Sequence, residues 1–262
     1  MLVFSAICPH PPILIPSIGK ESLDQIANTK KAMEKLEREL YASQPDILIV
    51  VSPHGEMQSD AFTINVSQKF NVNFEDFGDF ATKLELLGEL DLITTQKSVI
   101  DQKIPINIIS EPTLDHGTSV PIFYLTKNLP QTKILPIYFT LFDNQTHFEF
   151  GKILKEIIST TNERIAVVAS GDLSHCLTKN APLPFNEKGK EFDETLIKLI
   201  KNRDAQKTIN LDPQLIEGAG ECGLKSILIL LGILNNVNYN PEILSYEAPF
   251  GVGYLVTNLK LE

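Results

Sequence analysis

The fold is constrained most by short apolar runs, rich in β-branched residues, that recur along the whole chain. Such runs, bounded by turn-forming residues, are typical of buried β-strands. The predicted strands are Leu2–Ile7, Ile47–Val51, Phe62–Val66, Ile106–Ile109, Lys133–Phe139, Ile165–Ala169 and Gly253–Thr257. Segments whose apolar residues recur at helical spacing lie between these runs. The predicted helices are Ser22–Tyr41, Phe148–Thr160, Glu187–Lys201 and Cys222–Leu234.

This alternation of strands and helices predicts an α/β fold. We expect a single domain over residues 1–262, with a central, mostly parallel or mixed sheet flanked by helices on both faces. The sequence contains no internal repeat and no low-complexity linker. The segment Asn71–Glu89 has no clear period, and we expect it to form a loop or a short helix that lines a pocket.

The charge of the chain excludes some classes of partner. A formal net charge of −10, without a basic cluster, disfavours nucleic acid. No apolar stretch reaches the ~18 residues of a membrane span, and prolines interrupt the first apolar run, so we expect neither membrane insertion nor a signal peptide. The cysteines Cys8, Cys176 and Cys222 cannot all pair with one another. We therefore expect a cytoplasmic protein and, as the commonest assembly, a homodimer.

Four of the five histidines follow an apolar run or lie in a turn-like segment. His10 lies in ICPHPP, His54 in VVSPHGE, His116 in LDHGTS and His175 in ASGDLSH. Because the carboxyl ends of parallel strands meet at one edge of a sheet, these imidazoles are expected to converge there. Imidazole is a common metal ligand and transfers protons near neutral pH. His147 begins a predicted helix, and we expect it to have a structural role.

The segment EGAGECG offers a carboxylate that could complete a metal site. Two histidines and one carboxylate leave positions open on iron(II) for a substrate and dioxygen. Small residues precede Glu221 and Gly223 follows it, so the backbone can approach a metal closely. Alternatively, Glu221 interacts only with the N-terminus of the following helix. Glu217 and Cys222 are rival ligands.

Together these motifs resemble the class III extradiol ring-cleavage dioxygenases, the family of the catalytic subunit of protocatechuate 4,5-dioxygenase. The segments CPHPP, SPHGE, LDHGTSVP, ASGDLSH, GAGECG and YEAPFGVGYLV occur in that family's order and approximate spacing, from Leu2 to about Val256. The ECGL segment and the ending are more similar to a branch that includes the Memo proteins and the AmmeMemoRadiSam systems. The resemblance implies proteins of such systems as partners. Because the sequence ends at Glu262, we expect no fused domain of the kind found there.

The resemblance also implies residue roles and a reaction. His10 and His54 match two histidine ligands of an iron(II) ion, for which zinc is an alternative, and Glu221 matches the carboxylate ligand. His175 matches the active-site acid/base, and His116 matches a histidine that contacts the substrate. The implied activity is that of an oxidoreductase that cleaves a catechol-type ring beside its two hydroxyls. A small aromatic diol and dioxygen are the implied substrates.

Two other functions stay open at this point. The Memo-like branch has a cysteine near the position of Cys222, and a thiolate ligand would favour zinc, copper or redox sensing. The protein would then be a metal-binding redox or scaffold protein without ring-cleavage activity. A zinc hydrolase with the same ligands is the third reading.

Residues around the site have less specific signals. Asp172 or Asp115 could orient a neighbouring histidine, a role that ligating imidazoles usually need filled. Lys225 could bind a substrate carboxylate, but an ordinary helix lysine is the simpler interpretation. Aromatic residues that could wall a pocket, or belong to the core, are Phe77, Phe80, Tyr246 and Phe250.

Overall fold

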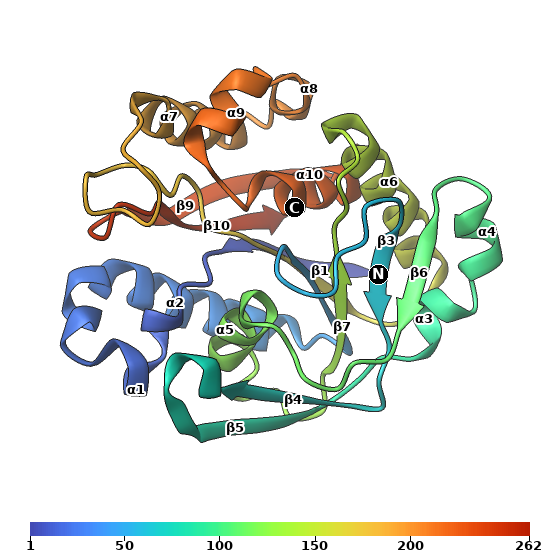
Figure 1. Cartoon of the computed structure of the whole chain (residues 1–262). Helices are drawn as coiled ribbons and strands as arrows, with labels where there is room; N and C mark the ends of the chain where they lie inside the picture. Colours follow the sequence, from blue (N-terminus) through green and yellow to red (C-terminus); the bar gives the residue numbers. More distant parts are fainter.

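A computed structural model describes all residues from 1 to 262. Its centre is an eight-stranded sheet with the strand order β6-β3-β7-β2-β8-β1-β10-β9 (Figure 1). The strands are β1 (Leu2–Cys8), β2 (Ile47–Ser52), β3 (Phe62–Asn65), β6 (Ile106–Ile109), β7 (Lys133–Tyr138), β8 (Ile165–Ser170), β9 (Tyr239–Glu247) and β10 (Tyr254–Leu261). The central strands β1, β8, β2 and β7 are parallel to one another. Antiparallel pairs β3–β7, β1–β10 and β9–β10 flank them, so the predicted mixed sheet is confirmed.

Helices cover both faces of this sheet (Figure 1). The helices are α1 (Pro16–Gly19), α2 (Ala27–Ser43), α3 (Asp91–Thr94), α4 (Lys97–Asp101), α5 (His116–Leu125), α6 (Asn144–Thr160), α7 (Glu187–Lys201), α8 (Ala205–Ile209), α9 (Pro213–Ala219) and α10 (Leu224–Ile233). The short 3₁₀ helices are η1 (Pro12–Leu14), η2 (Lys20–Ile26) and η3 (Glu75–Phe77). None of the helices is long and apolar enough to cross a membrane. The single-domain α/β class predicted from the sequence is confirmed.

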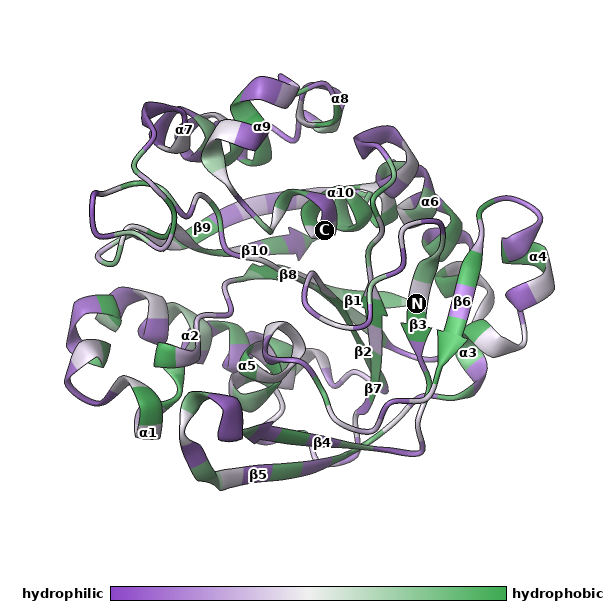
Figure 2. Ribbon diagram, in the orientation of Figure 1, coloured by the Kyte–Doolittle hydropathy of each residue, from purple (hydrophilic) through white to green (hydrophobic).

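The side chains of each central strand alternate between two apolar cores. In β2, Ile47, Ile49 and Val51 pack in the core beneath α6 and α10, whereas Leu48 and Val50 pack in the core beneath α2 and α5. Burial on both faces explains why these strands read as continuous apolar runs. The strands are accordingly green over most of their length in Figure 2.

The segment predicted to be a loop or a short helix is mainly a β-hairpin, so that prediction was wrong. Strands β4 (Lys69–Phe74) and β5 (Asp79–Leu87) pair antiparallel, and η3 lies between them. Phe70, Val72 and Phe74 are buried at alternate positions, which is the period of a half-buried strand. The intervening polar residues obscured this pattern in the sequence.

Two other boundaries differ from the predictions. The helix expected from Ser22 begins as the 3₁₀ helix η2, and α2 starts at Ala27. Strand β9 was not predicted, because it is half exposed and Pro241 interrupts its apolar residues. This proline is tolerated because β9 is the edge strand of the sheet.

Candidate metal centre

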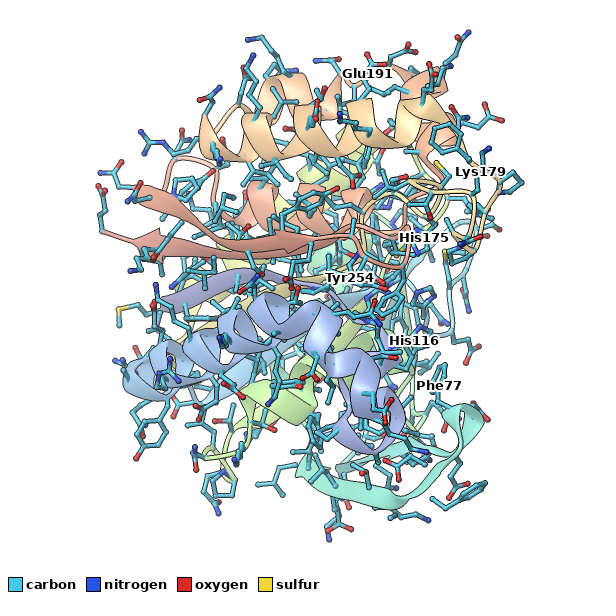
Figure 3. All side chains as sticks on the ribbon, turned by 90° about the vertical axis from the view of Figure 1, so that its left-hand side faces the viewer. Phe77, His116, His175, Lys179, Glu191 and Tyr254 are labelled. Carbon is cyan, nitrogen blue, oxygen red and sulfur yellow. The ribbon has the colours of Figure 1, made fainter.

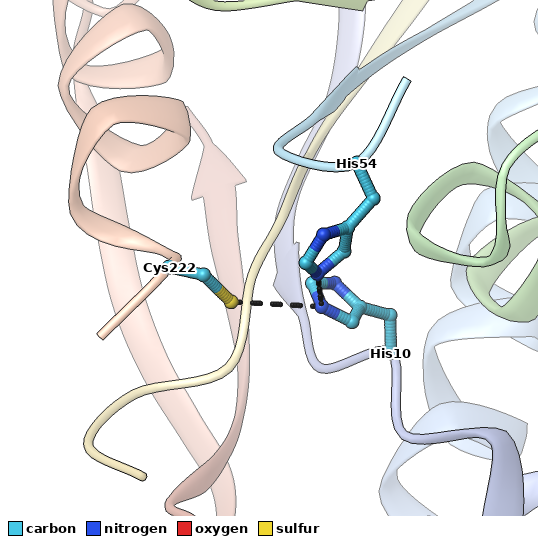
Figure 4. A group of neighbouring side chains, drawn as sticks. All are labelled: His10, His54 and Cys222. Atoms are coloured by element: carbon cyan, nitrogen blue, oxygen red, sulfur yellow. Dashed lines mark hydrogen bonds between the residues drawn. The ribbon is translucent and has the colours of Figure 1, made fainter. Parts of the chain in front are cut away.

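The predicted histidines meet at the carboxyl edge of the sheet. His10 lies just beyond β1, and His54 lies just beyond β2. Strand β8 separates these two strands and ends at Ser170. The segment before α10 brings Cys222 to the same place (Figure 4). Four segments that are distant in sequence therefore meet at one point.

Three donor atoms at this point form a group that could hold a metal ion. Nε2 of His10 lies 3.0 Å from Nε2 of His54, and 3.6 Å from Sγ of Cys222. All three atoms lie within 4.8 Å of one another. Two imidazole nitrogens and one sulfur in this arrangement match the donors preferred by transition metals.

Hydrogen bonds fix the tautomer of His10. The hydroxyl of Ser170 donates its one proton to the carbonyl oxygen of Gly117, at 2.5 Å. It can therefore only accept from Nδ1 of His10, which lies 2.9 Å away. Nδ1 carries the proton, and the lone pair of Nε2 faces His54 and Cys222. This is the state that a metal ligand requires.

Close backbone packing positions Cys222. A Cβ atom on Gly171 would lie 2.1 Å from the Cα atom of Gly223, so Gly171 has no room for a side chain, and a Cβ atom on Gly223 would lie only 3.1 Å from the carbonyl oxygen of Asp172. This contact brings the segment before α10 against the end of β8. The backbone N–H of Asp172 then donates to Sγ of Cys222, at 3.3 Å, and the backbone N–H of Cys222 donates to the carbonyl of Asp172, also at 3.3 Å.

Asp172 also holds the backbone of His10. Its carboxylate oxygen Oδ1 accepts from the N–H of His10, at 2.9 Å. Burial raises the pKa of the Asp172 carboxyl to about 7. Asp115, the other predicted orienting acid, accepts from the hydroxyl of Ser52, at 2.6 Å, and caps α5. The ring of His10 is thus oriented by Ser170 and not by either acid.

Burial shifts the pKa values of the three donor side chains. It lowers the pKa of His10 well below its ordinary value, and the neighbouring His54, His116 and His175 lower it further. Burial likewise lowers the pKa of His54 to about 4. The pKa of the Cys222 thiol is raised well above its ordinary value, mainly by burial. At neutral pH the imidazoles are therefore free bases, while the sulfur keeps its proton until a cation displaces it.

Glu221 lies beside this group but is not part of it. Its carboxylate accepts from the backbone N–H of Leu224, at 2.6 Å, at the start of α10. This contact matches the alternative interpretation, in which the acid interacts with the helix N-terminus. Burial raises the pKa of Glu221 to about 7. Lys225 donates to the carbonyl of Thr140, at 2.9 Å, and lies over the ring of Phe139.

His116 and His175 flank the group. The ring of His116 stacks on that of His54, with ring centroids 4.3 Å apart. It also packs edge-to-face against the ring of Phe77, with centroids 5.3 Å apart. Nδ1 of His175 is buried and has no hydrogen-bond partner in the chain. Figure 3 shows His175, His116 and Phe77 along one side of the molecule. Burial lowers the pKa of both histidines, so both are neutral at pH 7.

Most of the remaining candidate residues lie outside the site. His147 is fully buried within α6, where its ring bonds the backbone at Asp143 and Thr140, so its structural role was predicted correctly. Among the candidate wall residues, Phe77 contacts the site, whereas Phe80 is 71% exposed. Tyr246 bonds Asp193 and Phe250 packs against the core under α2 and α5. Sequence reasoning missed Ser170, because a serine that ends a strand carries no distinctive signal.

Comparisons with known proteins agree with this architecture. The family described as the catalytic LigB subunit of aromatic ring-opening dioxygenase matches residues 5–257. Protein CA_C1420 of Clostridium acetobutylicum is 31% identical over 97% of this chain and 56% of its own length. The chain thus spans little more than half of that relative.

More distant relatives carry names that refer to two kinds of protein. The 2-aminophenol 1,6-dioxygenase beta subunit of a Pseudomonas species is 22% identical over 99% of this chain and 94% of its own length. A MEMO1 family protein of Methanosarcina mazei is 32% identical, over 34% of this chain and 32% of its own length. An uncharacterized Escherichia coli protein of known structure shares the fold, with a TM-score of 0.69, 14% identity and coverage of 98% and 99% of the two chains.

Proposed function

The chain belongs to the family of the catalytic LigB subunit of aromatic ring-opening dioxygenases, and we propose that it is an oxidoreductase with one metal ion bound by His10, His54 and Cys222. The convergence of these three donor atoms within 4.8 Å carries the proposal. The fixed tautomer of His10 supports it, because the lone pair of Nε2 is already directed at the other two donors.

The chemistry of the donors favours one group of metals. A set of one thiolate and two imidazoles favours copper or zinc, whereas the set expected from the sequence, two imidazoles and a carboxylate, favours iron(II). A bound copper ion would supply one-electron chemistry, and a zinc ion would act as a Lewis acid. The protein supplies the preformed ligand set and the hydrogen bond from the N–H of Asp172 to the sulfur.

The flanking histidines would serve a small aromatic diol. The pKa of His175 is lowered by burial, so its imidazole is a free base at pH 7 and can accept a phenolic proton. His116 lies between His54 and Phe77, where it can hydrogen-bond a substrate hydroxyl. Phe77 offers an aromatic edge beside it, which suits a flat ring.

A second candidate function is iron-dependent ring opening with Glu221 as the third ligand. The similarity to the 2-aminophenol 1,6-dioxygenase beta subunit over nearly the whole chain favours it, as does the position of His175 and His116 beside the histidine pair. In this alternative, the Glu221 carboxylate must give up the 2.6 Å hydrogen bond that it accepts from the backbone N–H of Leu224. The hydrogen bond of Glu221 with Leu224 therefore favours Cys222 over Glu221 as the third metal ligand.

The test begins with metal-free protein under anaerobic conditions. Copper(II), cobalt(II) and iron(II) are added separately, and sulfur-to-metal charge-transfer absorbance is recorded for wild type and Cys222→Ala. Cys176→Ala is the control, because Cys176 is a buried cysteine outside the donor group. We expect the absorbance with wild type and the control, and its loss in Cys222→Ala. Absorbance that survives in Cys222→Ala would overturn the assignment of the sulfur.

Turnover is tested separately. Each metal-loaded form is mixed with oxygen and a panel of catechols and aminophenols, and ring absorbance and oxygen uptake are followed. Oxygen uptake that depends on an aromatic diol supports the oxidoreductase function. Metal binding without turnover of any compound in the panel would instead support the alternative function, a metal-binding redox or scaffold protein.

A further inference from the structure

Helix α7 buries a carboxylate on its apolar side. Asp193 is fully buried, together with Phe192, Leu196 and Ile200. A buried carboxylate without an ion pair is costly unless hydrogen bonds compensate it, and Asp193 forms no salt bridge within the chain. Burial raises the pKa of this carboxyl to about 6. An apolar side chain at this position would serve packing alone better, so the acid has another role.

The two oxygens of Asp193 accept hydrogen bonds from different segments. Oδ1 accepts from the backbone N–H of Ser174, at 2.9 Å, and Oδ2 accepts from the hydroxyl of Tyr246 in β9, at 2.6 Å. Gly253 fits against the carboxylate, because a Cβ atom there would lie 2.2 Å from Oδ2. Asp193 therefore joins α7, β9 and the segment after β8.

Ser174 is the point where these segments meet. Its carbonyl accepts from the N–H of Gly253, at 2.9 Å, and its hydroxyl donates to the carbonyl of Ala219, at 2.9 Å. The N–H of the next residue, His175, donates to the same carbonyl, at 3.2 Å. The backbone that carries His175 is thus held by these three contacts, together with the hydrogen bond from the N–H of Ser174 to Asp193.

We propose that Asp193 is a positioning residue for His175, which it orients through the N–H of Ser174 without touching the substrate. This inference rests on the proposed function only in taking His175 as the proton acceptor. Loss of both acceptor oxygens would release Ser174 and let the imidazole of His175 turn towards water. The burial that now lowers the pKa of His175 would then decrease.

The test follows the His175 ring by NMR in metal-free protein, over a pH titration, in wild type, Asp193→Leu, Asp193→Asn and Tyr246→Phe. The signal is assigned with His175→Gln. In Asp193→Leu, we expect the His175 pKa to rise towards its ordinary value of about 6.5. Asp193→Asn retains an acceptor for the N–H of Ser174, and its amide N–H can donate to the Tyr246 hydroxyl, so it is expected to match wild type. Tyr246→Phe removes the partner that holds Oδ2 in place, which leaves the carboxyl freer to turn away from Ser174, and is expected to give a smaller rise.

The outcomes separate positioning from packing. A lower melting temperature in Asp193→Leu with an unchanged His175 pKa would overturn the proposal. If Asp193→Leu does not fold, Tyr246→Phe decides, and an unchanged His175 pKa in that variant overturns it. The readout needs neither metal nor turnover. A wild-type protein without activity would therefore contradict the proposed function and leave this result intact.

Discussion

The sulfur of Cys222 lies 3.6 Å from Nε2 of His10, although 212 positions separate the two residues in the sequence. The contact depends on the fold, because strand β8 and the Gly171–Gly223 approach bring the two segments together. In the proposed centre, this thiol takes the third ligand position in place of the carboxylate expected from the sequence, which would change the chemistry that a bound metal supplies.

Metal affinity is expected to rise with pH, chiefly through the sulfur. The imidazoles of His10 and His54 are already neutral above pH 6, whereas the thiol of Cys222 keeps its proton. Binding should therefore release at least the thiol proton, and the association constant should rise at least about tenfold per pH unit between pH 6.5 and 8, because the neighbouring carboxyls of Asp172 and Glu221 also ionise near pH 7. Competition titrations with a chelator of known affinity measure this slope. A slope of zero in wild type would contradict a thiolate ligand.

The replacement Ser170→Ala tests the tautomer of His10. Without the hydroxyl, nothing holds the proton on Nδ1, and the Nε2 lone pair is no longer fixed towards the other donors. We expect metal affinity to fall by about 10- to 100-fold. The control is Ser5→Ala, a buried serine that bonds the carbonyl of Leu259 away from the site. Equal losses of affinity in the two variants would rule out a specific role for Ser170.

A methyl group at Gly171 should separate the two segments that form the site. In Gly171→Ala, the added carbon would meet the backbone of Gly223 at 2.1 Å. We expect the free energy of unfolding to fall by about 1–3 kcal/mol. We also expect metal affinity to decrease, because Cys222 would move away from the two histidines. The control is Gly78→Ala, where the turn has positive φ but open space around it. Unaltered metal affinity in Gly171→Ala would show that this contact does not position Cys222.

Glu221 is expected to destabilise the folded chain when it ionises. Its pKa in the folded chain, about 7, lies above its ordinary value of 4.5, so the native state binds this proton more tightly. The resulting stability is complete below pH 4.5 and is lost as the pH rises through 7. Urea unfolding of wild type and Glu221→Gln should therefore show wild type losing stability relative to the variant over this range. Glu217→Gln, at an exposed position, is the control, and its curve should run parallel to that of wild type.

The sequence was sufficient for the central strands but not for the edges of the fold. Strands such as β2 and β8 are buried on both faces, so their sequences are continuous apolar runs. Strands β4, β5 and β9 are half exposed, and their polar residues hide the alternation. Their positions depend on packing against distant segments, which a local pattern does not contain.

The same division applies to the site. The meeting of His10 and His54 follows from parallel strand order, because β1 and β2 flank β8 and end at one edge. The choice between Glu221 and Cys222 does not follow, since adjacent residues point in different directions. That choice depends on the contact of Gly171 with Gly223 and on the hydrogen bond from Leu224 to Glu221.

The most direct test of the proposed centre is the metal content of wild type, Cys222→Ala and Glu221→Ala, purified without added metal or chelator and measured by elemental analysis. We expect near-stoichiometric metal in wild type and in Glu221→Ala, and its loss in Cys222→Ala. Metal retained by Cys222→Ala but lost by Glu221→Ala would contradict the account and restore the carboxylate as the third ligand.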